Sequence, residues 1–480
     1  MAFAQSDNYW SWNFNTPSSL LSGAVVGGNA GPSSIYYNPA LIDHGNVPAL
    51  TVSANILSLQ FLNVNNVAGN GIDANQFIFK VQPRFISYTL PVKNNRLGIE
   101  VAILSPISEE VRFSLQHDNQ LDIIERTQGL ETYTGFLEYS RSYDDTWVGG
   151  GASYQVSDNL FLGLSSFVSI KLLKYKYSQS TKAFQENDSV LVGNLYEPKY
   201  IAESSFEEKF KYWYLSFIFK VGAQYISDSK QVSVGINITL PDLPIYGEAD
   251  IRKSVSRSNI YDNSSQSMVS NETTVQSIED SKVRVKNPFS IAIGGQYKTE
   301  DKKNFILLTA EYFHRIKSYA VVQSTLPPPN WLPNYFENKL SGNDFMSYNF
   351  EANSVTNVAV GFKHQISSSL IFLGGFRTDF TISNTDNPRF VTEKFAVNRI
   401  HFNKYHLTGG VVLKIKKFGV IGGAQYTRGK TENMPEMINY TTPREYIPET
   451  DQSLEGYRQN NTVAILNELS LFFGLTVDFD

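Results

Sequence analysis

Apolar and polar residues alternate with a period of two through most of this chain. In QVSVGINITL, residues 231–240, every second residue from Val232 to Leu240 is apolar and the residues between are small or polar. The last segment, ELSLFFGLTVDFD, alternates in the same way from Leu469 to Phe479. A two-residue period gives a β-strand one apolar and one polar face. The pattern therefore predicts an all-β protein.

Short turns join these alternating runs in pairs. Six predicted hairpins turn at 93–96, 157–159, 228–230, 299–303, 367–369 and near 416. One further strand is predicted before them, at 47–64, and one after them at the C-terminus. This arrangement predicts 14 strands with both termini on the short-turn side, which is the parity of bacterial outer-membrane barrels.

Long polar stretches separate the hairpins. They cover residues 106–133, 177–210, 248–286, 323–354, 385–401 and 431–461. So many long loops are unusual in a compact soluble domain, but an outer-membrane barrel has long extracellular loops opposite short periplasmic turns. A soluble β-sandwich or propeller would not explain this asymmetry. We therefore predict a 14-stranded antiparallel transmembrane β-barrel in the outer membrane, with outer-membrane lipid around it.

Composition supports the barrel and removes other classes. The chain has 480 residues, with 27 Tyr and 32 Phe, and barrels place aromatic residues in belts at the two membrane interfaces. A net charge of −5 argues against nucleic acid as a partner. No cofactor or metal is expected, because His401 and His406 would point to opposite faces of a strand, and no catalytic motif is present. We do not expect an enzyme.

The first 46 residues precede the first predicted strand. Ala2-Phe3-Ala4 has the form of a signal-peptidase site, so residues 1–4 are interpreted as a signal-peptide remnant. A barrel of 14 strands encloses a wide lumen. Residues 5–46 are therefore predicted to fold into that lumen as a hatch, and residues 47–480 to form the barrel. Three glycines allow tight bends in this segment: Gly27, Gly28 and Gly31. Side chains such as Tyr36 are predicted to supply apolar contacts to the wall.

The stretch SGAVVGGNAGPSSIYYNPALI resembles the N-terminal hatch of the FadL/TodX family of outer-membrane transporters for long-chain fatty acids and aromatic hydrocarbons. The resemblance rests on a glycine-rich run, the pair Ser33-Ser34, and Asn38-Pro39-Ala40 just before the first strand. It implies a hydrophobic small-molecule ligand that is captured among the extracellular loops, passes to a pocket above the hatch, and leaves through a gap in the wall. Separately, the end of the chain resembles the signal read by barrel-assembly machinery, with three residues at the matching places: Gly474, Val477 and Phe479.

Two functions remain open at this point. The first is a passive transporter for hydrophobic compounds with the hatch as gate, in which TLPPPNWLPNYF supplies an apolar capture site through Pro328, Trp331 and Tyr335. The alternative use of those residues is simple packing of the loop. The second function is an accessory subunit of a larger outer-membrane complex, for protein secretion or barrel assembly, with other outer-membrane proteins as partners. An apolar pocket would favour transport, and a lumen blocked by ordered polar contacts would favour the accessory role.

Charged residues also fall within predicted strands. Five of them are expected on the lumen side, where they shape passage, anchor the hatch or simply pair with one another: Arg84, Glu100, Glu311, Lys363 and Arg377.

Overall fold

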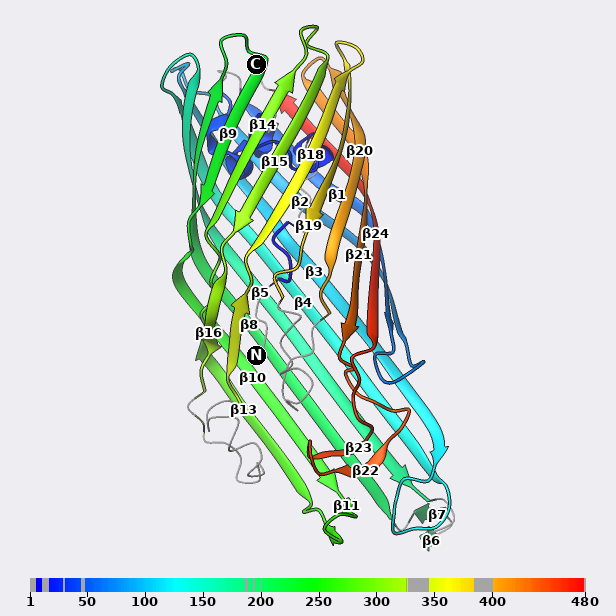
Figure 1. The fold of residues 1–480 in the computed structure, drawn as a ribbon. Coiled ribbons are helices and arrows are strands. Elements are labelled where there is room, and N and C mark those ends of the chain that lie inside the picture. Colours follow the sequence, from blue (N-terminus) through cyan, green and yellow to red (C-terminus); the bar gives the residue numbers. More distant parts are fainter. Residues whose placement is uncertain are drawn as a thin grey trace.

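The computed structural model describes residues 6–10, 17–28, 31–44, 48–185, 189–192, 195–198, 200–324, 326, 345–383 and 400–478. Its main feature is a tall, closed antiparallel barrel (Figure 1). No helix among these residues is long and apolar enough to cross a bilayer. The short helices are α1 (Pro17–Leu20), η1 (Gly31–Ser33), α2 (Ser34–Tyr37) and η2 (Pro39–Leu41).

Fourteen strands close the barrel, as the sequence predicts. Around the wall they are β1 (Ala49–Asn65), β2 (Ala74–Leu90), β3 (Leu97–Leu121), β4 (Glu131–Gln155), β5 (Leu160–Phe184), β8 (Ile201–Ile226), β9 (Val232–Thr239), β14 (Ser290–Lys298), β15 (Asn304–Phe313), β18 (Val355–Gln365), β19 (Leu370–Asp379), β20 (Asn403–Ile415), β21 (Phe418–Met434) and β24 (Thr462–Asp478). β24 pairs with β1 and β8 pairs with β9, so the ring has no open edge. All six predicted hairpins and both flanking strands are present.

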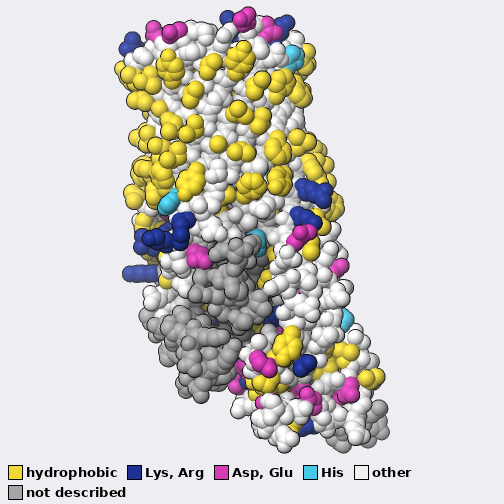
Figure 2. All heavy atoms as spheres, in the orientation of Figure 1, with side chains coloured by type: hydrophobic (Ala, Val, Ile, Leu, Met, Phe, Trp, Pro, Cys, Tyr) yellow, Lys and Arg dark blue, Asp and Glu magenta, His cyan; other side chains and the backbone are white. Residues whose placement is uncertain are grey.

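Exposed apolar side chains form a continuous band around the half of the barrel that carries the short turns (Figure 2). They include the outward residues of the period-two pattern, such as Val232 and Val234 on β9 and Leu469 and Phe473 on β24. Only a bilayer makes such a surface favourable. The short-turn end is therefore periplasmic, and the opposite half extends outside the cell.

Three stretches that were predicted as loops are largely strand. β3, β4, β5 and β8 have 25 or 26 residues each, whereas about 9–11 residues cross a bilayer. Most of 106–133 and 177–210 therefore belongs to a sheet that continues outside the membrane. In 248–286 lie β10 (Leu243–Ser258), the short pair β11 (Tyr261–Asp262) and β12 (Ser267–Met268), and β13 (Glu272–Lys282). The prediction failed because the outer face meets water there, and the apolar residues point inward instead.

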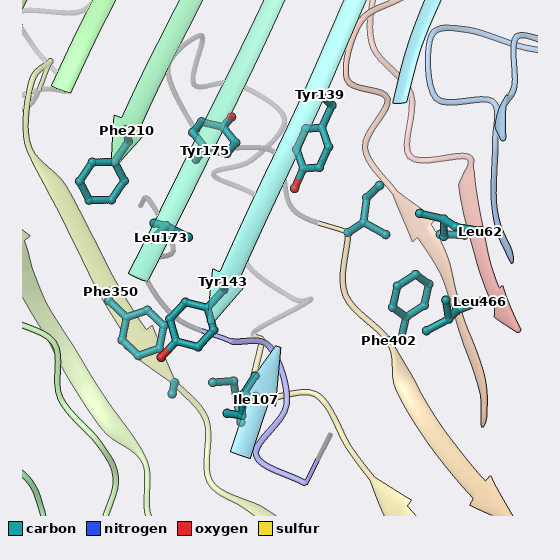
Figure 3. Packing of buried hydrophobic residues seen from close by; sticks show 14 of the residues in the cluster. Leu62, Ile107, Tyr139, Tyr143, Leu173, Tyr175, Phe210, Phe350, Phe402 and Leu466 are labelled. Atoms are coloured by element: carbon teal, nitrogen blue, oxygen red, sulfur yellow. The ribbon is translucent and has the colours of Figure 1, made fainter. Parts of the chain in front are cut away.

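We call the part of β3, β4, β5, β8, β10 and β13 that continues outside the membrane the extension. Its inner face carries buried aromatic side chains. Tyr139 and Tyr143 on β4, Tyr175 on β5 and Phe210 on β8 belong to one buried cluster and point into the interior (Figure 3). The alternation of β4 is regular, with buried residues at nearly every second position from Glu131 to Trp147.

Four strands of the barrel wall are each interrupted by a short break, at the same height along the barrel. β9 continues as β10, β14 is preceded by β13, β15 continues as β16 (Ile316–Val322), and β18 is preceded by β17 (Tyr348–Ala352). Pro241 and Pro288 lie in two of the breaks, and a proline cannot donate a ladder hydrogen bond.

The connection from β21 to β24 folds inward. We call residues 435–461 the cap loop; it holds β22 (Arg444–Ile447) and β23 (Gln452–Glu455). Tyr440 donates to the Phe136 carbonyl at 2.8 Å, and Tyr133 donates to the Leu454 carbonyl at 2.8 Å. The cap loop therefore rests on the inner face of the extension. A further short hairpin, β6 (Ser189–Val192) with β7 (Leu195–Pro198), lies between β5 and β8.

Candidate functional site

The N-terminal segment lies inside the barrel near its periplasmic end, where its short helices are the blue coils in Figure 1. Its side chains are almost entirely buried, with Leu20, Val25 and Ile35 at 0% exposure. Barrel strands surround it: α1 contacts β19, β20 and β21, and η2 contacts β4, β5 and β8. The described part of residues 5–46 therefore occupies the lumen.

Asn38, from the Asn-Pro-Ala motif, forms hydrogen bonds both within the N-terminal segment and to the barrel wall. Its side-chain oxygen accepts from the Ala40 N–H at 3.1 Å and caps η2, which begins at Pro39. Its Nδ2 donates to the Val26 carbonyl at 2.8 Å and to the Ala223 carbonyl of β8 at 3.2 Å. Only a short amide can accept and donate in this way. The motif therefore has a structural reason in this chain.

The wall receives the segment through inward-facing glycines. A Cβ on Gly222 would lie 2.1 Å from Asn38 Oδ1, and a Cβ on Gly235 would lie 2.0 Å from the Val26 carbonyl oxygen. Further wall glycines meet the segment in the same way: Gly98, Gly163, Gly294, Gly361, Gly375, Gly410 and Gly423. The backbone of the segment thus touches the backbone of the wall around most of the circumference, which leaves no room for a free passage there.

The predicted bend residues hold defined positions. The Gly27 carbonyl accepts from Ser233 at 2.6 Å, and Gly28 lies against the Gln296 side chain. Gly31 has φ +55°, in the left-handed region that favours glycine, and its carbonyl accepts from Ser34 at 2.6 Å.

Ser33 contacts Ser18 through their hydroxyls at 2.5 Å, which joins η1 to α1. Six of the predicted hatch residues, Gly27, Gly28, Gly31, Ser33, Ser34 and Asn38, thus make contacts within the segment or with the wall. Their role in a hatch stays a prediction.

A small cavity lies beside Tyr36, between the segment and the wall. It measures about 60 Å³ and is lined by aromatic residues, by Lys220 and by the break at Asn287-Pro288. The Lys220 ammonium lies 4.3 Å from the centre of the Tyr36 ring and donates to Thr239 at 3.0 Å. Lys220 is only 4% exposed and makes no ion pair with the described residues. A buried cation with so few partners is costly unless an anion joins it.

Residues 6–10 continue the segment toward the middle of the lumen. Asn8 donates to the carbonyls of Asp379 and Phe402, at 2.8 and 3.0 Å. Trp10 Nε1 donates to Glu311 at 2.6 Å. Asp7 lies 3.5 Å from Arg141 of β4. These contacts place the start of the described chain beside the charged inner wall.

The wall is incomplete between β2 and β3. Pairing between these strands covers only Phe85–Leu90 with Ile99–Leu104, although both strands continue outward. Pro83 and Pro106 lie where the pairing ends, and neither residue can donate a backbone hydrogen bond. We call this gap, between residues 74–83 of β2 and 107–121 of β3, the seam.

Side chains bridge the seam in place of a backbone ladder. Lys80 and Glu110 form an ion pair at 3.0 Å, and the Arg112 N–H donates to Gln76 at 2.9 Å. Outward of the seam stand three exposed apolar side chains of β2: Phe77, Phe79 and Val81. The seam is therefore level with the apolar band.

Arg84 lies at the inner end of the seam. It is the extra residue of a bulge in β2, since Ser53 faces Phe85 and Ala54 faces Pro83. Arg84 is 8% exposed, and its Nε and Nη1 have no hydrogen-bond partner among the described residues. It lines a cavity of about 70 Å³ that also touches the seam and residues 7–8. Other charged groups line this cavity: Glu109, Glu110, Arg141, Lys404, His406 and Glu468.

The other charged strand residues lie inside the wall as well. Glu100, Arg84 and Arg377 are buried, Glu311 accepts from Trp10 and from Ser290, and Lys363 lies over the Phe305 ring at 4.5 Å. Gly474 pairs with Ser53, and Val477 pairs with Leu50, within the β24–β1 closure. The capture residues Pro328, Trp331 and Tyr335 lie outside the described residues, as do Phe479 and residues 1–4.

The sequence reasoning did not single out Lys220 or the seam. Lys220 sits in FIFKVGAQY, where a single polar residue in an alternating strand carries no special signal. Two proline-containing dipeptides inside strands, Gln82-Pro83 and Ser105-Pro106, were the available clue to the seam. Among the described residues, no group of three or more His, Cys, Asp or Glu side chains is arranged to hold a metal ion.

Comparison with known proteins supports the fold. No protein-family model and no curated protein matches the sequence. Among solved structures, a FadL homologue from Pseudomonas aeruginosa matches over 100% of both chains, at 12% identity and a TM-score of 0.58. The toluene transporter TodX from P. putida matches over 96% of this chain and 97% of its own, at 10% identity and a TM-score of 0.53. The monoaromatic hydrocarbon channel CymD matches over 98% and 99%, at 10% identity and a TM-score of 0.50.

Proposed function

We infer that this chain, which has the fold of the FadL and TodX barrels and lies in the bacterial outer membrane, conducts small hydrophobic compounds from its lumen into the bilayer. TodX is a toluene transporter and CymD is a monoaromatic hydrocarbon channel. The observation that carries the proposal for this chain is the seam. It joins an internal cavity to the apolar outer surface at the level of the membrane.

The route is lateral because the lumen is filled below it. Wall glycines hold the N-terminal segment against nine strands' inner faces, so a compound that entered from outside would meet a closed floor. Residues 5–46 act as a fixed hatch in this proposal. A lipophilic compound also gains free energy by entering the bilayer directly instead of crossing the aqueous periplasm.

The cavity chemistry favours a compound with an acidic group, as in a fatty acid. Arg84 presents two unpartnered N–H groups at the inner end of the seam, and guanidinium binds carboxylates well. Lys220, beside the second cavity, forms no ion pair with the described residues, but the carboxylates of Asp145 and Glu311 line the same cavity. A neutral hydrocarbon would leave the Arg84 nitrogens without a partner, so we propose an amphipathic carboxylic acid as the ligand, with its carboxylate at Arg84.

A cross-link across the seam tests the route. The chain contains no cysteine, so Lys80→Cys with Glu110→Cys introduces the only two thiols. A short, reducible bis-thiol reagent should then hold the seam closed. We expect uptake of a radiolabelled long-chain fatty acid to fall to background and to recover when the link is reduced, because the barrel itself is unchanged.

The matched control places the thiols across a paired part of the wall. Phe136→Cys with Ser180→Cys joins directly opposed residues of β4 and β5, where the ladder is continuous. That link should leave uptake unchanged. Full uptake through a cross-linked seam would contradict the lateral route.

One observation favours a second function, an accessory subunit of a larger outer-membrane complex. The two cavities beside the N-terminal segment and the seam measure about 60 and 70 Å³, whereas sites for drug-sized ligands start at about 300 Å³. The 70 Å³ cavity is lined by ion pairs, including Lys404 with Glu109 at 3.2 Å. A pocket of about 440 Å³ is lined by residues of β4, β5, β8, β10 and β13, none of which is a strand of the seam. Native mass spectrometry after gentle extraction separates the two functions. A monomer with a small lipophilic mass supports transport, and a stable assembly with other envelope proteins and no ligand supports the accessory role.

A further inference from the structure

The outer surface changes polarity at two short segments of neighbouring strands. In VRVK, residues 283–286, the two valines are buried and point inward while Arg284 is exposed. In RIK, residues 315–317, Ile316 is buried while Arg315 and Lys317 are exposed. In the bilayer the apolar residues of each strand face outward, so this inversion marks the point where the strands leave the membrane.

These basic residues belong to adjacent parts of the wall. The Arg284 N–H donates to the Val321 carbonyl of β16 at 2.9 Å, and the Lys286 N–H donates to the Tyr319 hydroxyl at 3.0 Å. The wall is interrupted here, between β13 and β14 and between β15 and β16. Figure 2 shows the resulting basic patch directly beneath the apolar band, beside β16. We define the patch as Arg284, Lys286, Arg315 and Lys317.

Three of the four patch residues differ from two basic residues of the extension in their ion pairing. On the extension, Lys176 pairs with Glu138 at 2.5 Å and Lys209 pairs with Glu207 at 2.8 Å. Arg284, Arg315 and Lys317 form no ion pair with the described residues. Lys286 is engaged by the Tyr319 ring at 4.3 Å, which leaves its positive charge in place. Three positive charges therefore lie close together without an ion-pair partner among the described residues, and the charge of Lys286 lies beside them.

We propose that this patch binds the phosphate groups of the phosphorylated glycolipid, lipopolysaccharide, that forms the outer leaflet of the outer membrane. The proposal rests on the membrane location of the barrel and does not depend on transport. Arginine binds phosphate through paired hydrogen bonds, and lysine does so as a point charge. The glycolipid supplies acyl chains for the apolar band and phosphates at the extracellular edge of that band, where the patch lies.

The height of the patch favours a lipid over an acidic protein. Tyr312, the last outward aromatic residue of β15, is 41% exposed and lies three residues before Arg315. Exposed tyrosines of barrels mark the membrane interface. The patch is thus at headgroup level, whereas a soluble partner would find most of its surface on the extension farther out.

The test compares two triple variants that each remove three positive charges. Arg284→Gln/Arg315→Gln/Lys317→Gln neutralises the patch, and Lys93→Gln/Arg96→Gln/Lys303→Gln neutralises exposed residues at the periplasmic turns. Each purified barrel is titrated with diphosphorylated lipid A in detergent and analysed by native mass spectrometry. We expect the patch variant to bind about tenfold more weakly, because several charge-assisted hydrogen bonds are lost, and the turn variant to bind normally.

The change of electrophoretic mobility on heating shows whether each variant is folded. Should the patch variant fold poorly, Arg315→Gln/Lys317→Gln serves in its place with Lys176→Gln/Lys209→Gln as its control. Equal binding by patch and control variants would overturn the proposal. Equal binding of wild-type barrel to lipid A and to its dephosphorylated form would overturn it too, since the contact would then be apolar. A patch variant that keeps its lipid but loses a co-purifying protein would assign the patch to a protein partner instead.

Discussion

At the residue scale, close contact between small groups decides how the N-terminal segment is held. Asn38 uses both ends of its amide, and Gly222 and Gly235 make room for it on two neighbouring strands. These contacts leave no gap for a larger side chain. Packing this tight responds to a single added methyl group.

Gly222→Ala tests the fit. The new Cβ would lie 2.1 Å from Asn38 Oδ1, so the amide must move and its hydrogen bonds weaken. We expect a destabilisation of about 1–3 kcal/mol and a measurable leak of a small dye or antibiotic through the barrel. Gly409→Ala is the matched control, because no atom lies within 4 Å of its added Cβ. Identical permeability of the two variants would mean that the glycine fit does not seal the lumen.

Arg84→Gln tests the identity of the ligand. The change removes the positive charge at the inner end of the seam and leaves a shorter, neutral polar side chain. We expect fatty-acid uptake to fall by about tenfold, the loss of roughly one charge-assisted interaction, while uptake of toluene is unchanged. Lys363→Gln, a lumen-side cation next to the periplasmic turns, should affect neither compound. Parallel losses for acid and hydrocarbon would refute recognition of a carboxylate.

At the element scale, the cap loop is the part of the extracellular region whose docking depends on pH. Glu436 is 1% exposed, and burial raises its pKa above the usual glutamate value although the Gln459 N–H donates to Oε2 at 3.0 Å. Burial likewise raises the pKa of Glu445. A carboxyl group with a raised pKa holds its proton more tightly in the folded state than in the unfolded state. The contribution of these two glutamates to docking is therefore largest at low pH, and it is lost as pH rises from the ordinary glutamate pKa through the raised value.

Glu436→Gln isolates this contribution. The Oε1 atom of Glu436 has no hydrogen-bond partner among the described residues, so a neutral amide removes the cost of burying a charge there. We expect the backbone amides of the cap loop to exchange their hydrogens more slowly in the variant than in the wild type at pH 8, and at the same rate in both proteins at pH 4. Hydrogen exchange of residues 435–461, corrected for intrinsic rates, measures this. Glu449→Gln, at an exposed position of the same loop, serves as the control. Weaker protection of Glu436→Gln at pH 8 would contradict the argument.

At the scale of the whole molecule, one wall serves three environments. Its periplasmic half faces lipid and its outer half faces water. Its inner face holds the N-terminal segment near the periplasmic end and the cap loop at the extracellular end. The seam cross-link and the lipid A titration address separate parts of this wall, because the seam lies between β2 and β3 and the basic patch lies beside β16. Each result can therefore be interpreted without the other.

The alternation of residues by itself determined the barrel. Lipid requires an apolar outer face and a closed ladder, so the period-two pattern, the short turns and the strand parity predict one architecture even at 10–12% identity to solved barrels. The N-terminal segment drew attention for a related reason, since Asn-Pro-Ala and the glycine run are local signals, and its role as a hatch stays a prediction.

The extension, the seam and the two cavities were decided only by the tertiary structure. Outside the bilayer, water faces the outer wall and the inner wall is covered by distant chain, so strands at 106–133 lose the lipid-facing pattern and resemble loops. The seam exists because β2 and β3 pair over only part of their length. Arg84 lines the cavity because a bulge in β2 places its side chain on the inner side of the wall. Such features arise from contacts between residues far apart in the chain, which a local pattern of hydrophobicity does not encode.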